Sequence, residues 1–413
     1  MSLFLFLSVF LTHTVIGNTD TGQKPISPKK FPRVLLVHFK TKYWGGIENH
    51  TLNRYKMLIK NGYYANILVA PGSLMESVVT QLGLPSRKLA DKHISDDIYN
   101  ACKELAIDII MCPSSITLHA AKKVAKKLPL KIIGVRHVPV TGTYKLAIDS
   151  WKKLDGVIAV SPEITAYFNH VNKIKNLGIK NIMYIPPFFD EDKFFNFFTK
   201  DLENNFLTRT SQENYFKEKF NITFDKSPEN TTIACMIGNM YANVLHKNHG
   251  LLLQAIRKLI IVKNKSIHVM IAGSGDKKEF FEKMAHDMGI GNYVHFLGFV
   301  ADIPTLLHNC DIHVLTSNQE AFGQVHVEAG LMKKPSIGAT KTGATAIIIP
   351  DITGLLFNNG EENDLVNALE KLIDNPAQRK EMGEQAYTHV RSNFSNDMQF
   401  KKLELLLEAV AQS

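Results

Sequence analysis

Residues 311–335 read DIHVLTSNQEAFGQVHVEAGLMKKP. The apolar run Ile312–Leu315 is typical of a short buried strand. A polar loop follows over residues 317–323, and residues 325–332 predict a buried helix that ends before Pro335. A strand, a loop and a helix in this order indicate an open parallel α/β sheet. In such sheets, ligands bind at the carboxyl ends of the strands.

Two carboxylates stand eight positions apart in this stretch, Glu320 in the loop and Glu328 on the predicted helix. One carboxylate can face the reacting end of a ligand, and the other can accept hydrogen bonds from a hydroxyl pair such as a ribose diol. Backbone N–H groups of a helix that begins near Gly323 would suit a phosphate. The alternative is an exposed Glu and an unrelated Glu on a helix face.

The longer context distinguishes these two interpretations. Residues 320–340 read EAFGQVHVEAGLMKKPSIGAT, and GLLF follows at 354–357. This stretch resembles the retaining glycosyltransferases of family 4, which have the GT-B fold. Their motif runs approximately E-G-F-G-x-x-x-x-E-A-x-x-x-G-x-P-V-I-A, followed by T-G-x-L.

The resemblance implies an α/β protein of GT-B architecture, in which two Rossmann-like domains face each other across an interdomain cleft. It implies transfer of a sugar from a UDP- or GDP-linked donor, with retention of anomeric configuration. These enzymes need no metal cofactor, because cationic side chains and helix N-termini stabilise the leaving phosphate. The nucleotide sugar is then a substrate, and neither a cofactor nor a metal is expected.

The resemblance also implies roles for individual residues. Glu320 would contact the transferred sugar, Glu328 would bind the ribose, and Lys247 would bind the phosphates. Gly46 would approach the donor from the first domain. The residues that would surround the sugar and pyrophosphate through their backbone are Phe322, Gly323, Gln324 and Val325.

Two features of the first half match the family less fully. The predicted strand Val34–His38 precedes a Gly45–Gly46 loop, which as a turn alone would be unremarkable but which lines the cleft in the family. His137 follows the predicted strand Lys131–Val135, where the family places a His that contacts the transferred sugar. Here the next residue is Val138 rather than Asp, and a lone His is more often structural. We retain His137 as a candidate catalytic residue.

The phosphate-binding pattern departs from the family as well. Its members have an Arg directly after a glycine and a Lys farther along, and the two cations together hold the pyrophosphate. Here Gly238 is followed by Asn239, and Lys247 is the matching Lys. An amide brings no charge and no bidentate fork, so this substitution predicts a weaker donor site.

Predicted strands and helices alternate along the rest of the chain, which favours two parallel sheets. Asp190–Asp192 (D-E-D) is interpreted as a solvated acidic turn in the connection. The predicted boundaries are a leader and linker at 1–31, an acceptor-side Rossmann-like domain at 32–185, a hinge and connecting segment at 186–230, a nucleotide-sugar-binding domain at 231–395, and a terminal crossover helix at 396–413.

The chain of 413 residues carries a net charge of +9, which favours an anionic partner. With the resemblance, that partner is a nucleotide sugar together with a glycan or lipid-linked acceptor, and no nucleic acid is expected. The family relationship suggests biosynthesis of a cell-envelope polysaccharide or glycolipid. The four cysteines are scattered and predict neither a disulfide framework nor a zinc site.

An apolar run covers residues 3–17, with no Lys or Arg before it. It is consistent with a weak membrane anchor, an atypical signal peptide or a misassigned start. Lysines at 122, 123, 126 and 127 recur at helical spacing and, together with Lys131, Trp151, Lys152 and Lys153, form a second candidate contact with an anionic membrane surface. The expected location is cytoplasmic, either peripheral to the membrane or anchored in it at the N-terminus.

Two other classes of protein remain open. A secreted solute-binding protein would explain the leader and two α/β lobes, but not the paired carboxylates. A degenerate, non-catalytic transferase-like module would explain the motif together with Asn239.

Overall fold

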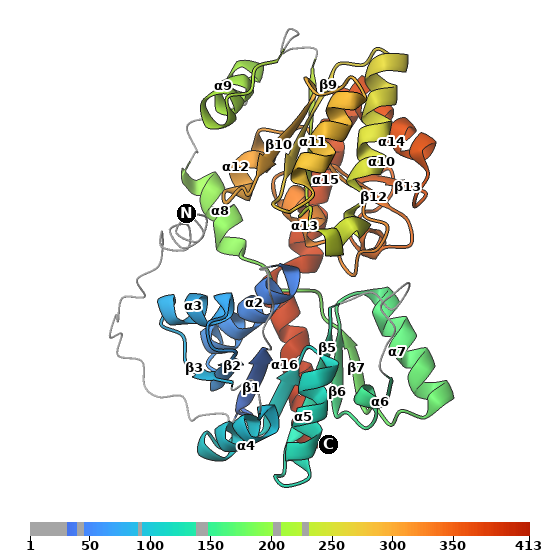
Figure 1. The fold of residues 1–413 in the computed structure, drawn as a ribbon. Helices are drawn as coiled ribbons and strands as arrows, with labels where there is room; N and C mark the ends of the chain where they lie inside the picture. Colours follow the sequence, from blue (N-terminus) through green and yellow to red (C-terminus); the bar gives the residue numbers. More distant parts are fainter. Residues whose placement is uncertain (1–30, 39–44, 90–92, 138–147, 201–207, 225–230) are drawn as a thin grey trace. The chain divides into compact units, whose positions relative to one another are not determined.

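The computed structural model describes residues 31–38, 45–89, 93–137, 148–200, 208–224 and 231–413 (Figure 1). The apolar run at 3–17 lies outside these residues. The described chain forms two compact units. Of the described residues, those from 31 to 137, from 148 to 189 and from 399 to 413 belong to unit 1, and those from 190 to 398 belong to unit 2. Each unit is an α/β structure built on its own parallel sheet.

Among the described residues, unit 1 has a seven-stranded parallel sheet in the order β3-β2-β1-β4-β5-β6-β7. Its strands are β1 (Val34–His38), β2 (Ala65–Val69), β3 (Ser86–Lys88), β4 (Ile109–Cys112), β5 (Lys131–Arg136), β6 (Gly156–Ala159) and β7 (Asn181–Tyr184). Its helices are α2 (Gly46–Lys60), α3 (Leu74–Gln81), α4 (Ile94–Glu104), α5 (Ser115–Ala125), α6 (Ile148–Trp151), α7 (Pro162–Lys175) and α16 (Asn396–Gln412), whose residues from 399 onward belong to this unit.

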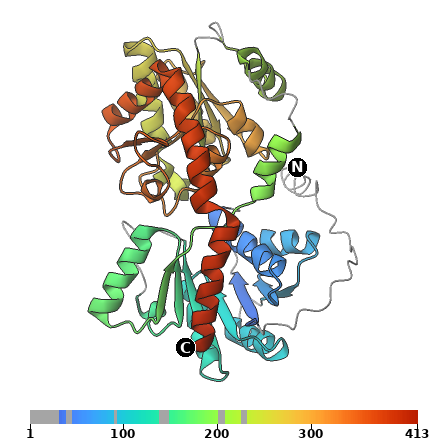
Figure 2. The ribbon, with the colours of Figure 1, turned by 180° about the vertical axis from the view of Figure 1, so that it is seen from behind.

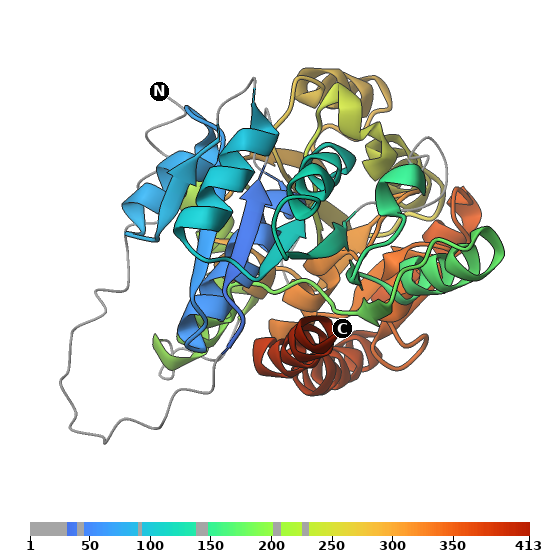
Figure 3. The same cartoon turned by 90° about the horizontal axis from the view of Figure 1, so that it is seen from below.

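The inner strands β1, β2, β4 and β6 of unit 1 are buried on both faces, because helices cover the sheet on each side. One core contains Val34 and Leu36 of β1, together with Leu52 and Leu58 of α2. Phe400, Leu403, Leu406, Leu407 and Val410 of α16 complete the same core. Figures 2 and 3 show α16 on one side of these strands, with α4 and α5 on the other. Helices α2 and α16 therefore share a face of the sheet.

Among the described residues, unit 2 has a six-stranded parallel sheet in the order β10-β9-β8-β11-β12-β13. Its strands are β8 (Thr232–Ile237), β9 (Ile267–Ala272), β10 (Val294–Gly298), β11 (Ile312–Leu315), β12 (Ser336–Ala339) and β13 (Gly354–Phe357). Its α-helices are α8 (Glu191–Lys200), α9 (Arg209–Phe220), α10 (His249–Arg257), α11 (Lys278–Asp287), α12 (Ile303–His308), α13 (Gln324–Leu331), α14 (Glu362–Asp374) and α15 (Pro376–Phe394). Three shorter turns are the 3₁₀ segments η3 (Ala242–Lys247) and η5 (Gly343–Ala346) and the π-helical turn η4 (Lys258–Val262).

In each sheet the first strand in the sequence is an inner strand, and the strand order runs in opposite directions on its two sides. In unit 1 the reversal lies between β1 and β4, and in unit 2 between β8 and β11. This order is the one found in dinucleotide-binding sheets, where ligands bind at the reversal point beyond the carboxyl ends of the strands. The prediction of two Rossmann-like domains is confirmed at the level of the fold.

Two sequence-based interpretations are wrong. Asp190 and Asp192 are exposed as predicted, but the segment is not a turn, since α8 begins at Glu191 and the Glu191 carboxylate accepts a hydrogen bond from the backbone N–H of Asn396 (2.7 Å). Burial raises the pKa of this carboxyl. Trp151 is buried and tilts against Phe168, so it cannot join a surface that contacts lipid. No helix in the described part of the chain is long and apolar enough to span a membrane.

Candidate functional site

The loops after β8 and β11 meet at the reversal point of unit 2. Thr316 directly follows β11 and is fully buried. Its hydroxyl lies 3.0 Å from the carbonyl oxygen of Lys247 and 2.9 Å from that of Asn248, so it can donate to either one. The backbone N–H of Asn318 donates to the carbonyl of His246 (2.8 Å). These contacts fix the backbone beside Lys247 against the loop that carries Glu320.

Lys247 and Glu320 form an ion pair, with 2.5 Å between the Lys247 Nζ and the Glu320 Oε2. The two side chains are about one-fifth exposed, at 20% and 19%. Burial lowers the pKa of neighbouring His246, and the charge of Lys247 lowers it further while Glu320 opposes this. The pair places a cation and a carboxylate side by side at the carboxyl edge of the sheet.

Helix α13 brings the second carboxylate to the same edge. Gly323 precedes the helix with a φ of +87°, a conformation that favours glycine. The Gln324 amide donates to Glu328 Oε1 (2.8 Å), which orients the carboxylate along the helix. Burial raises the pKa of the Glu328 carboxyl, although the side chain keeps some contact with solvent. The first turn of α13 also points backbone N–H groups out of the helix end, as a phosphate site requires.

A tight turn after β12 supports the Glu320 loop from behind. The backbone N–H of Gly343 donates to the carbonyl of Glu320 (2.8 Å). A Cβ atom at Gly343 would lie only 2.4 Å from the Phe322 Cα, so only glycine fits here without a shift. Phe322 itself is buried and lies edge-on to Phe394 of α15. The backbone at the centre of the motif is therefore held by packing.

The glycine before Asn239 belongs to a second supported loop. The Asn239 amide oxygen accepts a hydrogen bond from the backbone N–H of Ser274 (3.2 Å). His249 Nε2 lies 3.3 Å from the carbonyl of Gly238. Burial lowers the pKa of His249 to about 4, so at neutral pH the ring is uncharged and Nε2 carries its proton. The Asn239 amide oxygen is thus engaged in a hydrogen bond within the protein, and the neutral His249 ring contributes no charge to the site.

His137 and Gly46 belong to unit 1. Gly46 is the first residue of α2, and Glu48 caps the helix by accepting from the N–H of Gly45 (2.9 Å). His137 follows β5, and its Nδ1 lies 3.2 Å from the Nδ1 of His50 on α2. Burial and the charges of nearby cationic groups hold the pKa of His137 well below its usual range. His137 is therefore a neutral imidazole at physiological pH.

Each predicted residue of unit 2 lies near one edge of its sheet, but their contacts differ. Lys247 contacts Glu320, Gln324 contacts Glu328, and Val325 packs partly against the hydrophobic core. Sequence reasoning missed Thr316, which looked like the end of an apolar strand. It also missed His38, His50 and Arg54, although His50 and Arg54 stand at helical spacing after the glycine pair.

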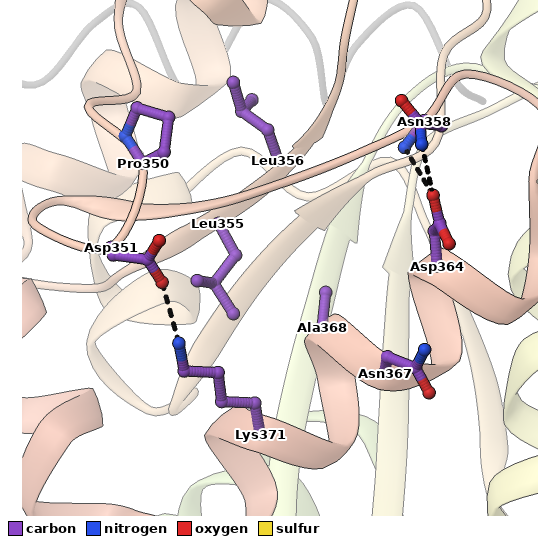
Figure 4. A pocket seen from close by; sticks show the side chains of 9 residues that line it. All are labelled: Pro350, Asp351, Leu355, Leu356, Asn358, Asp364, Asn367, Ala368 and Lys371. Carbon is purple, nitrogen blue, oxygen red and sulfur yellow. Dashed lines mark hydrogen bonds and ion pairs between the residues drawn. The ribbon is translucent and has the colours of Figure 1, made fainter.

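A shallow pocket lies elsewhere in unit 2, between β13 and α14 (Figure 4). An ion pair between Asp351 and Lys371 (2.7 Å) stands at one side of it, and a hydrogen bond from Asn358 to Asp364 (2.6 Å) at the other. None of the predicted site residues lines this pocket. In the described ranges, no group of three or more His, Cys, Asp and Glu side chains could hold a metal ion.

Comparison with known proteins finds sequence similarity in the second half of the chain. Residues 218–389 match the sequence model of the family described as Glycosyl transferases group 1. The capsular polysaccharide biosynthesis glycosyltransferase CapM of Staphylococcus aureus is 25% identical over 167 residues, which are 40% of this chain and 44% of that protein. A D-inositol 3-phosphate glycosyltransferase of Corynebacterium kroppenstedtii is 30% identical over 176 residues, 41% of this chain and 38% of that protein. The chain thus aligns with less than half the length of these relatives.

Solved structures match over almost the whole chain. HepE of Anabaena, solved in complex with UDP, has a TM-score of 0.74 at 17% identity and covers 91% of this chain and 100% of its own. A glycosyltransferase of Rickettsia africae has a TM-score of 0.73 at 22% identity, with 93% and 100% covered. At 17% and 22% sequence identity, these matches show that the fold is shared. The chain therefore has the GT-B fold, and residues 218–389 are similar to the glycosyl transferases group 1 family.

Proposed function

We propose that the chain is a glycosyltransferase that moves a sugar from a UDP- or GDP-linked donor to a hydroxyl of a glycan or lipid-linked acceptor. The observation that carries this proposal is the Lys247–Glu320 pair at the reversal point of unit 2, with Glu328 on the following helix. The UDP bound in HepE and the polysaccharide role of CapM support the substrate classes.

The roles of the two carboxylates follow from their surroundings. Lys247 would transfer its ionic contact from Glu320 to the donor phosphates, because a pyrophosphate offers more negative charge than one carboxylate. Glu320 would then face the transferred sugar. Glu328, whose raised pKa reflects burial, would hold the ribose hydroxyls with Gln324 beside it. Backbone N–H groups at the start of α13 would share the phosphate charge.

We further propose retention of anomeric configuration and independence of metal ions, as in glycosyltransferase family 4. The resemblance of residues 320–340 supports both. Lys247 and the α13 N-terminus can supply stabilisation of the leaving phosphate that a divalent cation supplies elsewhere. No side chain among the site residues has the surroundings of an obvious covalent nucleophile.

The experiment has two stages. A thermal-shift screen across UDP- and GDP-linked sugars identifies the donor, since a ligand at 100 times its Kd stabilises the folded state by about 2.7 kcal/mol. Proton NMR of the first product with an acceptor panel then reports the anomeric configuration, with and without EDTA. The proposal predicts a retained anomer formed equally fast in EDTA. An inverted anomer would contradict retention, and loss of turnover in EDTA would contradict metal independence.

A non-catalytic binding module is the second candidate, and Asn239 is the observation that favours it. Its amide is engaged with Ser274 and brings no charge to the phosphate site. Asn239→Arg would lose that hydrogen bond, worth about 1 kcal/mol, and gain charge-assisted contacts of about 1.5–3 kcal/mol. Donor binding should therefore tighten. Nucleotide-sugar binding without turnover in the NMR assay would favour this candidate over the enzyme.

We also propose that the lysines of α5 meet an anionic membrane surface. Lys123 is exposed in the last turn of α5 and Lys126 and Lys127 are exposed just beyond its end, whereas Lys122 donates to the carbonyl of Asp149 (3.1 Å). Each exposed Lys near such a surface can contribute about 1 kcal/mol at moderate salt. The full-length chain should bind anionic vesicles more than neutral ones, and triple substitution of these lysines by Glu should abolish the difference. Unchanged binding by the triple variant would contradict this role.

A further inference from the structure

A cluster of basic side chains lies at the carboxyl edge of the unit 1 sheet, on the face that α2 covers. His38 ends β1 and His137 follows β5, and each continues the alternating face that packs under α2. His50 and Arg54 extend from the buried side of α2, one helical turn apart. We call these four residues the Arg54 cluster. It adjoins the reversal point between β1 and β4, where a parallel sheet binds ligands.

Arg54 is the unusual member of the cluster. The side chain is only 2% exposed, and burial lowers the pKa of its guanidinium to about 10, which leaves it charged at neutral pH. Its Nε and Nη2 atoms are buried and have no hydrogen-bond acceptor among the residues that the structure describes. A buried cation without a partner is costly, so each such group in a folded protein calls for a counter-charge or a ligand.

The protein supplies little negative charge near this cation. Glu48 Oε1 lies 3.8 Å from His38 Nε2, and Glu48 Oε2 accepts a hydrogen bond from the Gly45 N–H. The sequence segments that follow β1 and His137, FKTKYW at 39–44 and VPVTGTYKLA at 138–147, contain no Asp or Glu. Arg54 brings a positive charge to the cluster, and neither adjacent segment contributes a carboxylate that could neutralise it.

The histidines of the cluster provide donors as well. His50 and His137 meet through their Nδ1 atoms, so one of these atoms donates and the other accepts. With His50 donating, His137 carries its proton on Nε2, a buried atom without an acceptor among the described residues. His137 Nε2 then joins Arg54 Nε and Nη2 as an unsatisfied N–H donor. A divalent cation is excluded here by the adjacent guanidinium charge and by a single carboxylate.

We infer that the Arg54 cluster binds an oxyanion, a phosphate or carboxylate group carried by the acceptor substrate. The Arg fork and the His137 N–H supply directed donors, and the N-terminus of α2 adds a favourable dipole. This assignment of the oxyanion to the acceptor rests on the proposed glycosyl transfer. The existence of the oxyanion site itself rests only on the cluster.

The test is binding of inorganic phosphate to the full-length chain, with UDP added at saturation to occupy the phosphate site beside Lys247. Phosphate should raise the melting temperature more than KCl of equal ionic strength does. Arg54→Met keeps the side-chain volume and removes the charge. Without phosphate it should melt higher than the wild type, because no unpaired buried charge remains. With phosphate, it should bind roughly ten- to a hundredfold more weakly.

Two further variants make the test specific. Lys60→Met removes the same charge from the exposed end of α2 and should keep the full phosphate response. Arg54→Lys keeps the positive charge but loses the paired N–H donors of the guanidinium group. Phosphate should therefore raise its melting temperature less than that of the wild type. Acetate tests the carboxylate form of the ligand, and a response to acetate or phosphate that depends on Arg54 supports the inference. An equal oxyanion response in the wild type and Arg54→Met would overturn it.

The same series separates the two proposals. If UDP fails to bind while the phosphate response still depends on Arg54, the proposed transferase function fails and the oxyanion site stands. If UDP binds and Lys247→Met abolishes that binding, but phosphate acts independently of Arg54, the oxyanion site fails alone. Phosphate titrations of Lys247→Met without UDP supply the control for overlap between the two sites.

Discussion

The Lys247–Glu320 ion pair has a consequence for substrate binding. Each partner satisfies the charge of the other, and both are mostly shielded from water. In the proposed function, a donor phosphate would compete with Glu320 for the Lys247 ammonium group. The carboxylate would therefore weaken ground-state binding of the donor and would leave Lys247 only when the donor is in place. Such an interaction favours catalysis over tight binding.

This arrangement separates the effects of changing the two carboxylates. Glu320→Gln should lower kcat by about a hundredfold, because the charge facing the reacting sugar is lost. It should also tighten UDP binding up to about fivefold, because Lys247 no longer has a competing partner. Glu328→Gln should instead weaken UDP binding by roughly tenfold, with a smaller effect on kcat. Steady-state kinetics and calorimetry with UDP measure both.

The two variants serve as controls for each other, since each replaces one carboxylate of the same motif by its amide. Equal and small effects on kcat and on UDP affinity would contradict the assignment of both residues. Weaker UDP binding by Glu320→Gln would mean that Glu320 supports the phosphate site instead of competing with the phosphate.

Residue types are readable from the sequence, but their contacts are not. The motif by itself indicates Glu320, Glu328 and Lys247 as candidates. The pairing of Lys247 with Glu320 joins residues 73 positions apart, and the contact of His50 with His137 spans 87 positions. Neither contact can be predicted from the spacing of nearby residues, because the order of the strands in the sheet decides which loops lie side by side. In the sequence Arg54 is one polar helix residue among several, and only its burial distinguishes it.

At the scale of elements, the turn at η5 positions the Glu320 loop. The close approach of Gly343 to the Phe322 backbone leaves no room for a side chain. Gly343→Ala should therefore displace residues 320–323 and lower kcat/KM by about tenfold or more, since small misplacements of catalytic groups are costly. Global stability should fall by about 1–3 kcal/mol. Kinetics together with urea unfolding test this prediction.

Gly291→Ala is the matched control for that substitution. A Cβ at Gly291 would meet its nearest neighbour at 3.5 Å, an ordinary contact, in the same unit of the chain. It should leave kcat/KM unchanged. Normal kinetics in Gly343→Ala would show that the turn does not position the carboxylate.

Apolar patterning located most elements and failed for particular ones. The predicted ranges of β1 and β11 coincide with those of the structure, because each is a short apolar run between clear boundaries. Strand β3 was missed, since Ser86–Lys88 is a polar edge strand with no apolar alternation. Helix α8 was missed because Asp190–Asp192 is typical of a turn, and the contact of Glu191 with Asn396 joins distant parts of the chain.

At the scale of the whole molecule, buried histidines link stability to pH. Burial lowers the pKa of His249 and His308 to about 4, and of His268 and His313 to about 3. The ordinary value, near 6.5, applies in the unfolded chain, so unfolding takes up protons below that pH. The stabilising contribution is complete above pH 6.5 and is lost as the pH falls toward 4 and then 3.

The free energy of unfolding should therefore decrease between pH 6.5 and 4, by up to about 1.4 kcal/mol per pH unit for each proton taken up. Urea unfolding at a series of pH values measures the slope. His268→Gln should reduce it by close to one proton, because the ring facing His295 at 3.0 Å is removed. His286→Gln, at an exposed position on α11, should not change it. A flat stability profile over this range would contradict the burial of these rings.

We propose that unit 2 binds the diphosphate of a nucleotide sugar through Lys247. Calorimetric titration of UDP and GDP into the full-length wild type, Lys247→Ala and Lys283→Ala tests it most directly. Lys283 is an exposed cation of the same unit, paired with Asp287 on α11. We expect the wild type and Lys283→Ala to bind one of the two nucleotides with equal affinity. Lys247→Ala should bind the same nucleotide roughly ten- to a hundredfold more weakly. Equal affinity in Lys247→Ala and the wild type, or no binding of either nucleotide to the wild type, would contradict the account.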